Sequence, residues 1–277
     1  MGATSSTLTS LALVLVGAAA CAPCAAGSFV PGGITYVWWD FGIPEFETFE
    51  IDVTIHNDVG TRPGIYFQMY QCRIGKIGCY FGFQTDVFDP NQRGGRGKGI
   101  LYSRWGTRDL ADVRAVSAGW AQSAGYEGDF VGVRMKYEWT NHPYRFRLTP
   151  VDEDEEGVWY GLFVLDHETK REDYAGAIRF EKTAGRAPLI QNGGVTWTEV
   201  YTGVRSPAHI PYWQLSIDGC SVQPRGGRGA RVKPKSARSD YARKNANSDI
   251  YFDPERNRIL MKLGSDVRRE HPKGRLY

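Results

Sequence analysis

The sequence predicts an all-β protein that folds as an antiparallel β-sandwich of the jelly-roll type. Glycine (33 residues) and aromatic residues (13%) are both abundant, which suits short strands and tight turns better than long helices. Short strand-like stretches also follow one another, separated by breaks rich in Gly, Pro or Asp, with few helical stretches between them. With 42% hydrophobic residues, the 277-residue chain is long enough to bury one substantial core.

Alternation of apolar and polar residues defines the expected strands. In residues 49–56 it places apolar side chains on one face and polar side chains on the other. The same pattern recurs in residues 131–139 and 144–148, whereas residues 158–165 form a more continuous apolar run, as expected of a strand covered on both faces. Residues 109–124 are expected to hold a helical turn or a long loop. The remaining expected strands are residues 65–72, 79–87, 99–105, 175–180, 195–201 and 212–217.

Residues 1–26 have the features of an export signal. Residues 11–20 (LALVLVGAAA) are apolar, but this run is shorter than the roughly 20 residues that span a bilayer. A short apolar run followed by small residues is typical of a secretory signal peptide. The alternative is a lipoprotein signal, with the lipid attached to Cys21. Either reading predicts a secreted or cell-surface protein with no transmembrane segment after signal removal.

The remainder divides into a β-sandwich domain at residues 28–222 and a basic tail at residues 223–277. The tail contains 15 Lys and Arg against 6 Asp and Glu, although the net charge of the whole chain is only +3. Its polar, glycine-rich composition predicts a largely irregular, flexible segment, with an apolar cluster at residues 250–263 that can dock as an extra hairpin. Its charge predicts attraction to an anionic surface; the alternative is a solvated tail without a specific partner.

Two glycine–arginine segments, residues 93–99 and 225–231, are of the kind that binds nucleic acid electrostatically. An exported protein rarely meets nucleic acid, so we expect no such partner. The sequence contains no phosphate-binding loop, and its five His are scattered without a zinc pattern, so we expect no cofactor and no metal. The acidic run at residues 152–156 lacks the ligand spacing of a calcium loop and is expected to be a solvated turn.

Cys72 and Cys79 flank the sequence RIGKIG, which is expected to form the loop of a hairpin. Symmetric pairing of its strands places the two cysteines opposite each other. They are therefore expected either to form a cross-strand disulfide in an oxidising compartment or to remain two small buried thiols. Cys220 has no evident partner apart from Cys24.

The sharpest enzymatic lead is Glu50-Ile51-Asp52-Val53, which resembles the start of the catalytic strand of laminarinase-type jelly-roll glycosidases. Retaining hydrolysis of this kind needs two carboxyl groups about 5 Å apart. Glu50 and Asp52 share a strand face, but Thr54 stands where a third carboxylate is required. A glycan-cleaving enzyme, glycosidase or lyase, that uses Glu50 and Asp52 is therefore the alternative to a non-catalytic protein.

The ligand-binding candidates are aromatic and polar residues on the expected hairpin. Tyr66, Gln68 and Tyr70 are spaced to share one strand face, and Arg104 and Trp105 end a neighbouring strand. Aromatic rings beside Gln and Arg suit stacking on the apolar faces of sugars, with polar groups that hold the hydroxyls. We expect a protein that binds carbohydrate or another surface ligand without catalysis.

Two segments resemble the signature strands of an exported family, domain of unknown function 3472. Residues 80–84 (YFGFQ) match its YFG-apolar-Q strand, and residues 100–105 (ILYSRW) match its ILFS-x-W strand, with Tyr102 in place of Phe. The resemblance covers residues 35–217 and omits the basic tail. It implies a concanavalin-like β-sandwich, found in secreted or cell-surface proteins near carbohydrate-processing modules, and it supplies no catalytic residues.

Overall fold

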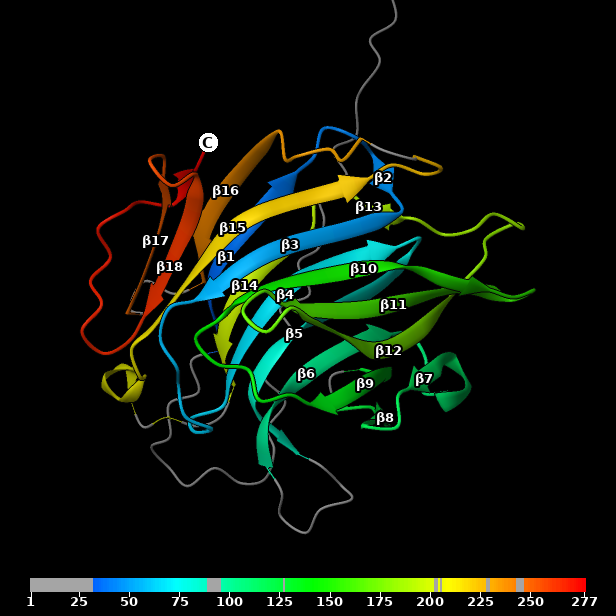
Figure 1. The fold of residues 1–277 in the computed structure, drawn as a ribbon, viewed down its shortest axis with the longest axis horizontal. Helices are drawn as coiled ribbons and strands as arrows, with labels where there is room; N and C mark the ends of the chain where they lie inside the picture. Colours follow the sequence, from blue (N-terminus) through cyan, green and yellow to red (C-terminus); the bar gives the residue numbers. More distant parts are fainter. Residues whose placement is uncertain are drawn as a thin grey trace, which may run out of the picture.

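In a computed structural model, the chain forms two antiparallel sheets packed face to face (Figure 1). The structure describes residues 32–88, 96–126, 128–201, 204, 206–227, 230–242 and 247–277. The predictions for residues 1–26, including Cys21 and Cys24, lie outside these described residues. Among the described residues the only helices are two 3-10 turns, η1 (Leu110–Asp112) and η2 (Pro207–His209), and neither has the length or apolarity to cross a membrane.

The larger sheet has eleven strands. Two of them, the short strands β2 (Glu45–Phe46) and β13 (Ile190–Gln191), pair with each other beside β4. The other nine run in the order β19 (Gly274–Arg275), β16 (Ser236–Tyr241), β1 (Gly32–Asp40), β14 (Val195–Val200), β4 (Ile65–Ile74), β5 (Ile77–Phe88), β6 (Arg96–Trp105), β9 (Phe130–Lys136) and β8 (Gly119–Ala124).

The smaller sheet has eight strands and faces the viewer in Figure 1. Their order is β17 (Ser248–Asp253), β18 (Arg258–Leu263), β15 (Trp213–Gln223), β3 (Thr48–Ile55), β10 (Pro143–Glu153), β11 (Gly157–Asp166), β12 (Arg171–Glu181) and β7 (Val113–Ala115). The predicted all-β sandwich is thus confirmed. Residues 109–124, expected as a helical turn or loop, contain η1, β7 and β8.

One core lies between the sheets, and the alternation seen in the sequence selects its residues. Along β3, Phe49, Ile51 and Val53 are fully buried and point inward, while Asp52 and Thr54 are partly exposed on the other face. The pattern expected for residues 49–56 is therefore the pattern of the folded strand, and burial of the apolar face stabilises the sandwich.

The C-terminal segment differs from the irregular tail expected for residues 223–277. Strand β16 joins the larger sheet beside β1, and β17 and β18 form a hairpin that extends the smaller sheet beside β15 (Figure 1). The hairpin agrees with the docking predicted for residues 250–263. Ala237, Ile250 and Met261 are buried in the common core. These buried apolar side chains hold the segment against the core despite its basic composition.

Cys72 and Cys79 pair directly across β4 and β5, as expected. Their Sγ atoms are 3.5 Å apart, however, and both side chains are free thiols, as is that of Cys220. The predicted disulfide is therefore wrong, and the alternative of two buried thiols is what the structure contains. Burial, together with the neighbouring Cys79, raises the pKa of the Cys72 thiol well above its ordinary value, so the protonated form is favoured.

Candidate ligand-binding site

The three candidates on β4 do not share a face, because the strand contains a bulge. Gln68 pairs with Gly82 and Tyr70 pairs with the next residue of β5, Phe81, so Met69 is an extra residue in β4. The bulge turns Tyr70 into the core, where its ring stacks on that of Phe49 at a centroid distance of 3.8 Å. Tyr66 and Gln68 remain on the outer face of the larger sheet. The expected grouping of all three residues is wrong.

Gly82 permits the bulge. A Cβ atom on this residue would lie 2.0 Å from the carbonyl oxygen of Phe67, a distance that no side chain tolerates. The glycine of the YFGFQ segment is therefore explained by close approach of the β4 backbone.

Arg104 and Trp105 point to opposite faces, as consecutive residues of a strand must. Arg104 lies between the sheets at 1% exposure, where its Nη2 atom donates to Glu181 Oε1 at 2.6 Å and its Nη1 atom donates to the carbonyl oxygen of Arg179. Trp105 lies on the outer face, packed against the ring of Tyr80 at 4.7 Å. Arg104 is therefore a buried ion-pair residue that no surface ligand reaches, contrary to the expectation.

The outer face of the larger sheet is rich in aromatic side chains, and we call it the aromatic face. Two groups of rings occupy it. The first group lies on β1 and β14, where Tyr36 pairs directly with Trp197 at a centroid distance of 5.3 Å and lies 6.3 Å from Trp38. The second group lies on β4, β5 and β6 and contains Tyr66, Tyr80 and Trp105. Gln68, which pairs with both Trp197 and Gly82, and Gln71 lie between the groups.

The rings differ in how accessible they are. Tyr66 and Tyr80 are buried beneath their neighbours, at 3% and 8% exposure, and Tyr201 packs against them. Tyr36, Trp38, Trp105 and Trp197 are partly exposed. The partly exposed rings are therefore the ones that a ligand reaches first, and the buried tyrosines support them from behind.

Several polar atoms of the aromatic face have no hydrogen-bond partner among the described residues. These atoms are Gln68 Oε1 and the indole nitrogens of Trp38, Trp105 and Trp197. Gln68 itself is fully buried, and its Nε2 atom donates to Gln71 Oε1 at 3.3 Å. A buried polar atom without a partner costs about 1–3 kcal/mol. Such atoms are few in native proteins, so each one needs a structural explanation.

Sequence patterns identified only part of this face. The expected set contains Trp105 but not the other partly exposed rings, Tyr36, Trp38 and Trp197. The expected strands do not include residues 32–40, and no ligand-binding residue is expected in residues 195–201. The available signal was the alternation of Tyr36 and Trp38 with Val37 and Trp39, which places two aromatic residues on the face opposite the core.

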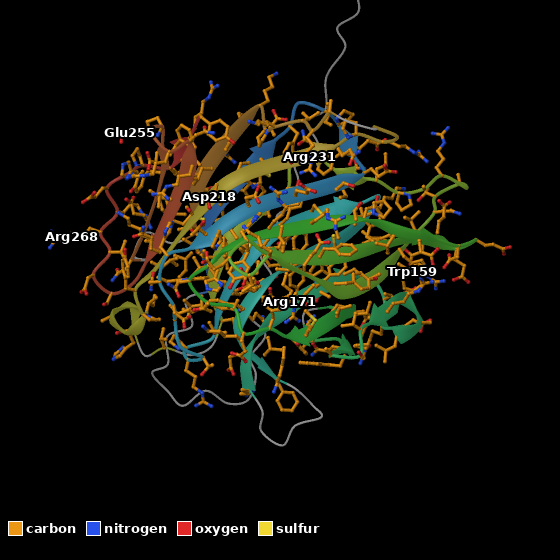
Figure 2. All side chains as sticks on the ribbon, in the orientation of Figure 1. Trp159, Arg171, Asp218, Arg231, Glu255 and Arg268 are labelled. Carbon is orange, nitrogen blue, oxygen red and sulfur yellow. The ribbon has the colours of Figure 1, made fainter. Side chains whose placement is uncertain are left out.

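The carboxylates of the enzymatic alternative lie on the other side of the molecule, on the outer face of the smaller sheet. Glu50 and Asp52 do share a face of β3, as expected. Glu50 is 5% exposed and accepts a hydrogen bond from Arg231 Nη2 at 2.8 Å. Asp52 accepts from Arg145 Nε and Nη2 at 2.8 and 3.0 Å, and His167 Nε2 lies 3.2 Å away. Both carboxylates are thus held in ion pairs with arginine (Figure 2 labels Arg231).

A second polar group on this sheet contains a serine, a histidine and an aspartate. Ser216 Oγ donates to Asp218 Oδ1 at 2.7 Å, and His56 Nε2 lies 2.9 Å from the same Oγ (Figure 2 labels Asp218). Because the hydroxyl proton goes to the carboxylate, His56 must donate to Ser216 and cannot act as its base. Burial, and then the charge of Arg258, lower the pKa of His56. This group stabilises the strand pairing rather than activating a nucleophile.

The described residues contain no cluster of His, Cys, Asp and Glu able to hold a metal ion. The acidic run at residues 152–156 is used in local contacts. Asp152 pairs with Arg114 at 2.5 Å, and Asp154 Oδ2 accepts from the indole nitrogen of Trp159 at 2.7 Å. Glu156 pairs with Arg179. These carboxylates belong to a charged turn with specific protein partners.

No family model matches the chain, and no curated protein matches it in sequence. Among solved structures, it is similar to scytalido-glutamic peptidase with a peptide-based transition-state analogue, at 10% identity and a TM-score of 0.46, over 85% of this chain and 100% of the peptidase chain. A second structure of that peptidase, with a transition-state analogue inhibitor, gives 8% identity and a TM-score of 0.43 over 85% and 99% of the two chains. These values describe a similarity in fold alone.

Proposed function

We propose that this protein binds polysaccharide through the aromatic face, without cleaving it. The observation that carries the proposal is the group of partly exposed rings on adjacent strands, Tyr36 and Trp38 on β1 and Trp197 on β14. Flat rings presented by a rigid sheet stack against the C–H faces of pyranose rings, and they lose little conformational freedom on doing so.

Polar groups beside the rings suit sugar hydroxyls. Gln71 and Gln84 are partly exposed on the same face, and each amide offers both donors and an acceptor. A ligand that combines apolar faces with many hydroxyls matches this mixture better than a purely apolar or a purely ionic ligand.

The glycan-cleaving alternative has less support from the geometry. Hydrolysis needs a carboxylate free to attack or a carboxylic acid free to donate a proton. Glu50 and Asp52 are each paired with an arginine, and they lie on the smaller sheet, on the opposite side of the sandwich from the aromatic face. The proposal includes export of the protein to the cell surface, where polysaccharides are abundant. It also includes membership of the family that the sequence resembles.

The test uses purified full-length protein and a panel of insoluble polysaccharides. Protein depletion from solution and the release of new reducing ends are followed in the same tubes. Depletion without new ends is expected for at least one polysaccharide, and Trp197→Ala should weaken it about tenfold, because a stacked aromatic ring is a typical binding hot spot. Tyr212→Ala serves as the matched control, since Tyr212 is 49% exposed but lies at an end of the smaller sheet.

Trp197→Leu keeps an apolar side chain and removes the flat ring, so it separates loss of stacking from loss of folding. Both Trp197 variants are compared with the wild type in thermal unfolding. Three results would each overturn the proposal. Depletion could be unaffected by both Trp197→Ala and Trp197→Leu, it could be absent for every polysaccharide, or new reducing ends could be released.

A further inference from the structure

We propose that the polysaccharide is acidic, and that a cationic edge formed by the C-terminal segment binds its carboxylate or sulfate groups. This inference rests on the proposed function and specifies its substrate class. It comes from the strand order of the larger sheet, in which β1 is followed by β16 and β19. Two of the residues that continue the aromatic face across these strands, Arg238 and Arg275, are basic.

A single row of directly paired residues links the rings to the charges. Trp38 pairs with Arg238 across β1 and β16, and Arg238 pairs with Arg275 across β16 and β19. Directly paired residues point to the same face of a sheet, so both guanidinium groups project on the side of the aromatic face. Adjacent strands are about 4.8 Å apart, roughly the length of one pyranose unit. A sugar chain lying across the strands can therefore stack on Trp38 and present its next units to the arginines.

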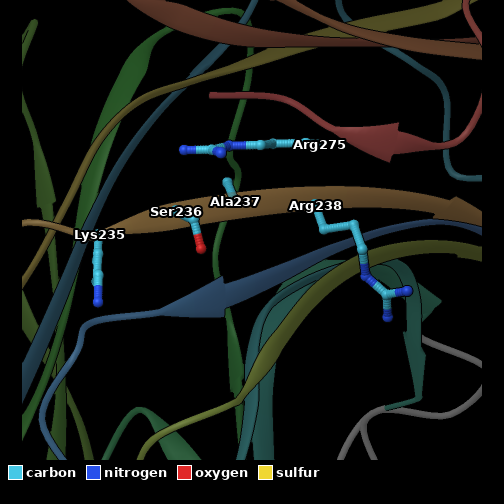
Figure 3. A pocket seen from close by; sticks show the side chains of 5 residues that line it. All are labelled: Lys235, Ser236, Ala237, Arg238 and Arg275. Carbon is cyan, nitrogen blue, oxygen red and sulfur yellow. The ribbon is translucent and has the colours of Figure 1, made fainter.

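The molecule is hollowed at this edge. An open pocket of about 380 Å³ is lined by Lys235, Ser236, Ala237, Arg238 and Arg275. Figure 3 shows the charged ends of Lys235, Arg238 and Arg275 spread around it rather than gathered at one point. Three cations without a lining carboxylate suit a ligand with repeated negative charges better than one small anion. Arg guanidinium groups in particular bind carboxylate and sulfate oxygens in pairs.

The nearest carboxylates have other partners. Asp40, which pairs with Ser236 in register, accepts hydrogen bonds from Asn192 Nδ2 and from the backbone N–H of Gly42. These bonds, and the charge of Lys235, lower its pKa. Asp240 lies 3.6 Å from Lys273 Nζ. Arg275 Nε donates to Tyr277 O at 3.0 Å. The side chains of the edge therefore comprise four cations and two carboxylates, so their balance is positive.

An extended sugar chain fits the edge better than a membrane does. Arg238 and Arg275 lie in a row that continues from Trp38, and a lipid surface offers no sugar faces for the partly exposed rings. The sequence predicts a flexible basic tail, whereas Arg238 and Arg275 lie on strands of the same sheet as the rings. Membranes and nucleic acids become outcomes of the test.

The experiment compares polysaccharides that differ only in charge. Affinity electrophoresis of the full-length protein is run through gels that contain polygalacturonate or its fully methyl-esterified form, and dextran sulfate or dextran. The acidic member of at least one pair is expected to bind about tenfold more tightly, with an affinity that falls as salt is raised, because exposed charges are screened. The two pairs separate carboxylate from sulfate as the preferred group.

Arg238→Gln combined with Arg275→Gln should abolish this preference and leave binding to the neutral member unchanged. The matched control is Arg256→Gln combined with Arg268→Gln, which removes the same net charge from exposed residues of the C-terminal segment outside β16 and β19. Because all four residues are at the surface, the thermal unfolding midpoint of each double variant should stay near that of the wild type.

The possible failures are distinguishable. Equal binding to neutral and acidic members, or a preference unaffected by the Arg238 and Arg275 changes, overturns the cationic edge but leaves polysaccharide binding intact. No binding to any polysaccharide overturns both proposals. The protein could instead bind vesicles that contain phosphatidylserine, or single-stranded DNA, through these arginines and bind no polysaccharide. The ligand of the cationic edge would then be that lipid surface or nucleic acid, and the acidic polysaccharide would be excluded.

Discussion

Gly194 lies directly against the ring of Tyr70, so closely that a Cβ atom at position 194 would be 2.2 Å from Tyr70 Cζ. Tyr70 in turn stacks on Phe49, which joins the two sheets through the core. Gly194→Ala is therefore expected to lower the free energy of unfolding by about 1–3 kcal/mol, because the ring has no room to move. Urea denaturation measures the change. Gly60→Ala, where an added Cβ meets only one atom at 3.9 Å, should be nearly neutral. Equal effects of the two substitutions would contradict this description of the core.

Arg104 should matter for stability and not for ligand binding. Its side chain is 2% exposed and pairs with Glu181, with Asp112 at 4.0 Å. Arg104→Met removes the guanidinium that bonds Glu181 and the carbonyl oxygen of Arg179. Asp112 keeps its ion pair with Arg179 and Glu181 is half exposed, so we expect a loss of about 1–3 kcal/mol. Thermal or urea unfolding should reveal the loss, while binding to polysaccharide at a permissive temperature stays unchanged. If the variant has normal stability but no longer binds polysaccharide, Arg104 belongs to the ligand-binding site after all.

The last four residues should stabilise the sandwich. Strand β19 pairs with β16, the backbone N–H of Leu276 donates to the carbonyl oxygen of Ala237 at 2.8 Å, and the ring of Tyr277 lies 5.0 Å from that of Phe252. Deletion of residues 274–277 exposes apolar surface that these residues cover, at about 25 cal/mol per Å². We expect a loss of about 2–4 kcal/mol in urea denaturation. An unchanged midpoint would mean that this segment does not dock in solution.

The carboxyl group of Asp166 should contribute stability that disappears in acid. Burial raises its pKa, but hydrogen bonds from His142 and from the backbone N–H groups of Thr169 and Glu168 outweigh that effect, so the pKa lies below its ordinary value. Because the folded-state pKa is lowered, the ionised carboxylate stabilises the fold at pH values above the unfolded-state pKa of about 4. This stabilisation is lost as the pH falls through the folded-state pKa.

The difference in unfolding free energy between the wild type and Asp166→Asn should therefore shrink as the pH is lowered from about 5 to about 3. The exposed Asp266→Asn serves as the control. If this difference in unfolding free energy grows as the pH falls, the stabilising role assigned to the ionised Asp166 is contradicted.

The sequence was sufficient for the fold class because β3 and its neighbours alternate cleanly between apolar and polar residues. It was insufficient for β16, whose residues SARSDY bury only small side chains, so the strand has no hydrophobic signature of its own. Its position is set by pairing with β1, a long-range contact that periodicity does not encode.

The candidate site was predicted in part. Tyr66, Gln68 and Trp105 do lie on one face, but the bulge at Met69 reverses the direction of Tyr70, and Arg104 precedes Trp105 by one residue and so points inward. A bulge inserts one residue without any change in hydrophobic composition, so spacing alone misplaces every residue beyond it. The rings of Tyr36 and Trp197 meet only because β1 pairs with β14, about 160 residues away in sequence.

Hydroxyl-radical footprinting with and without an oligosaccharide from a bound polysaccharide tests the aromatic face most directly. Mass spectrometry then reports the oxidation of each aromatic residue. The account predicts that Trp38 and Trp197 become protected, while the exposed Tyr126 and Tyr212, which lie elsewhere, keep their oxidation rates. Protection at Tyr212 or Tyr126 with none at Trp38 and Trp197 would contradict the assignment of the aromatic face as the binding surface.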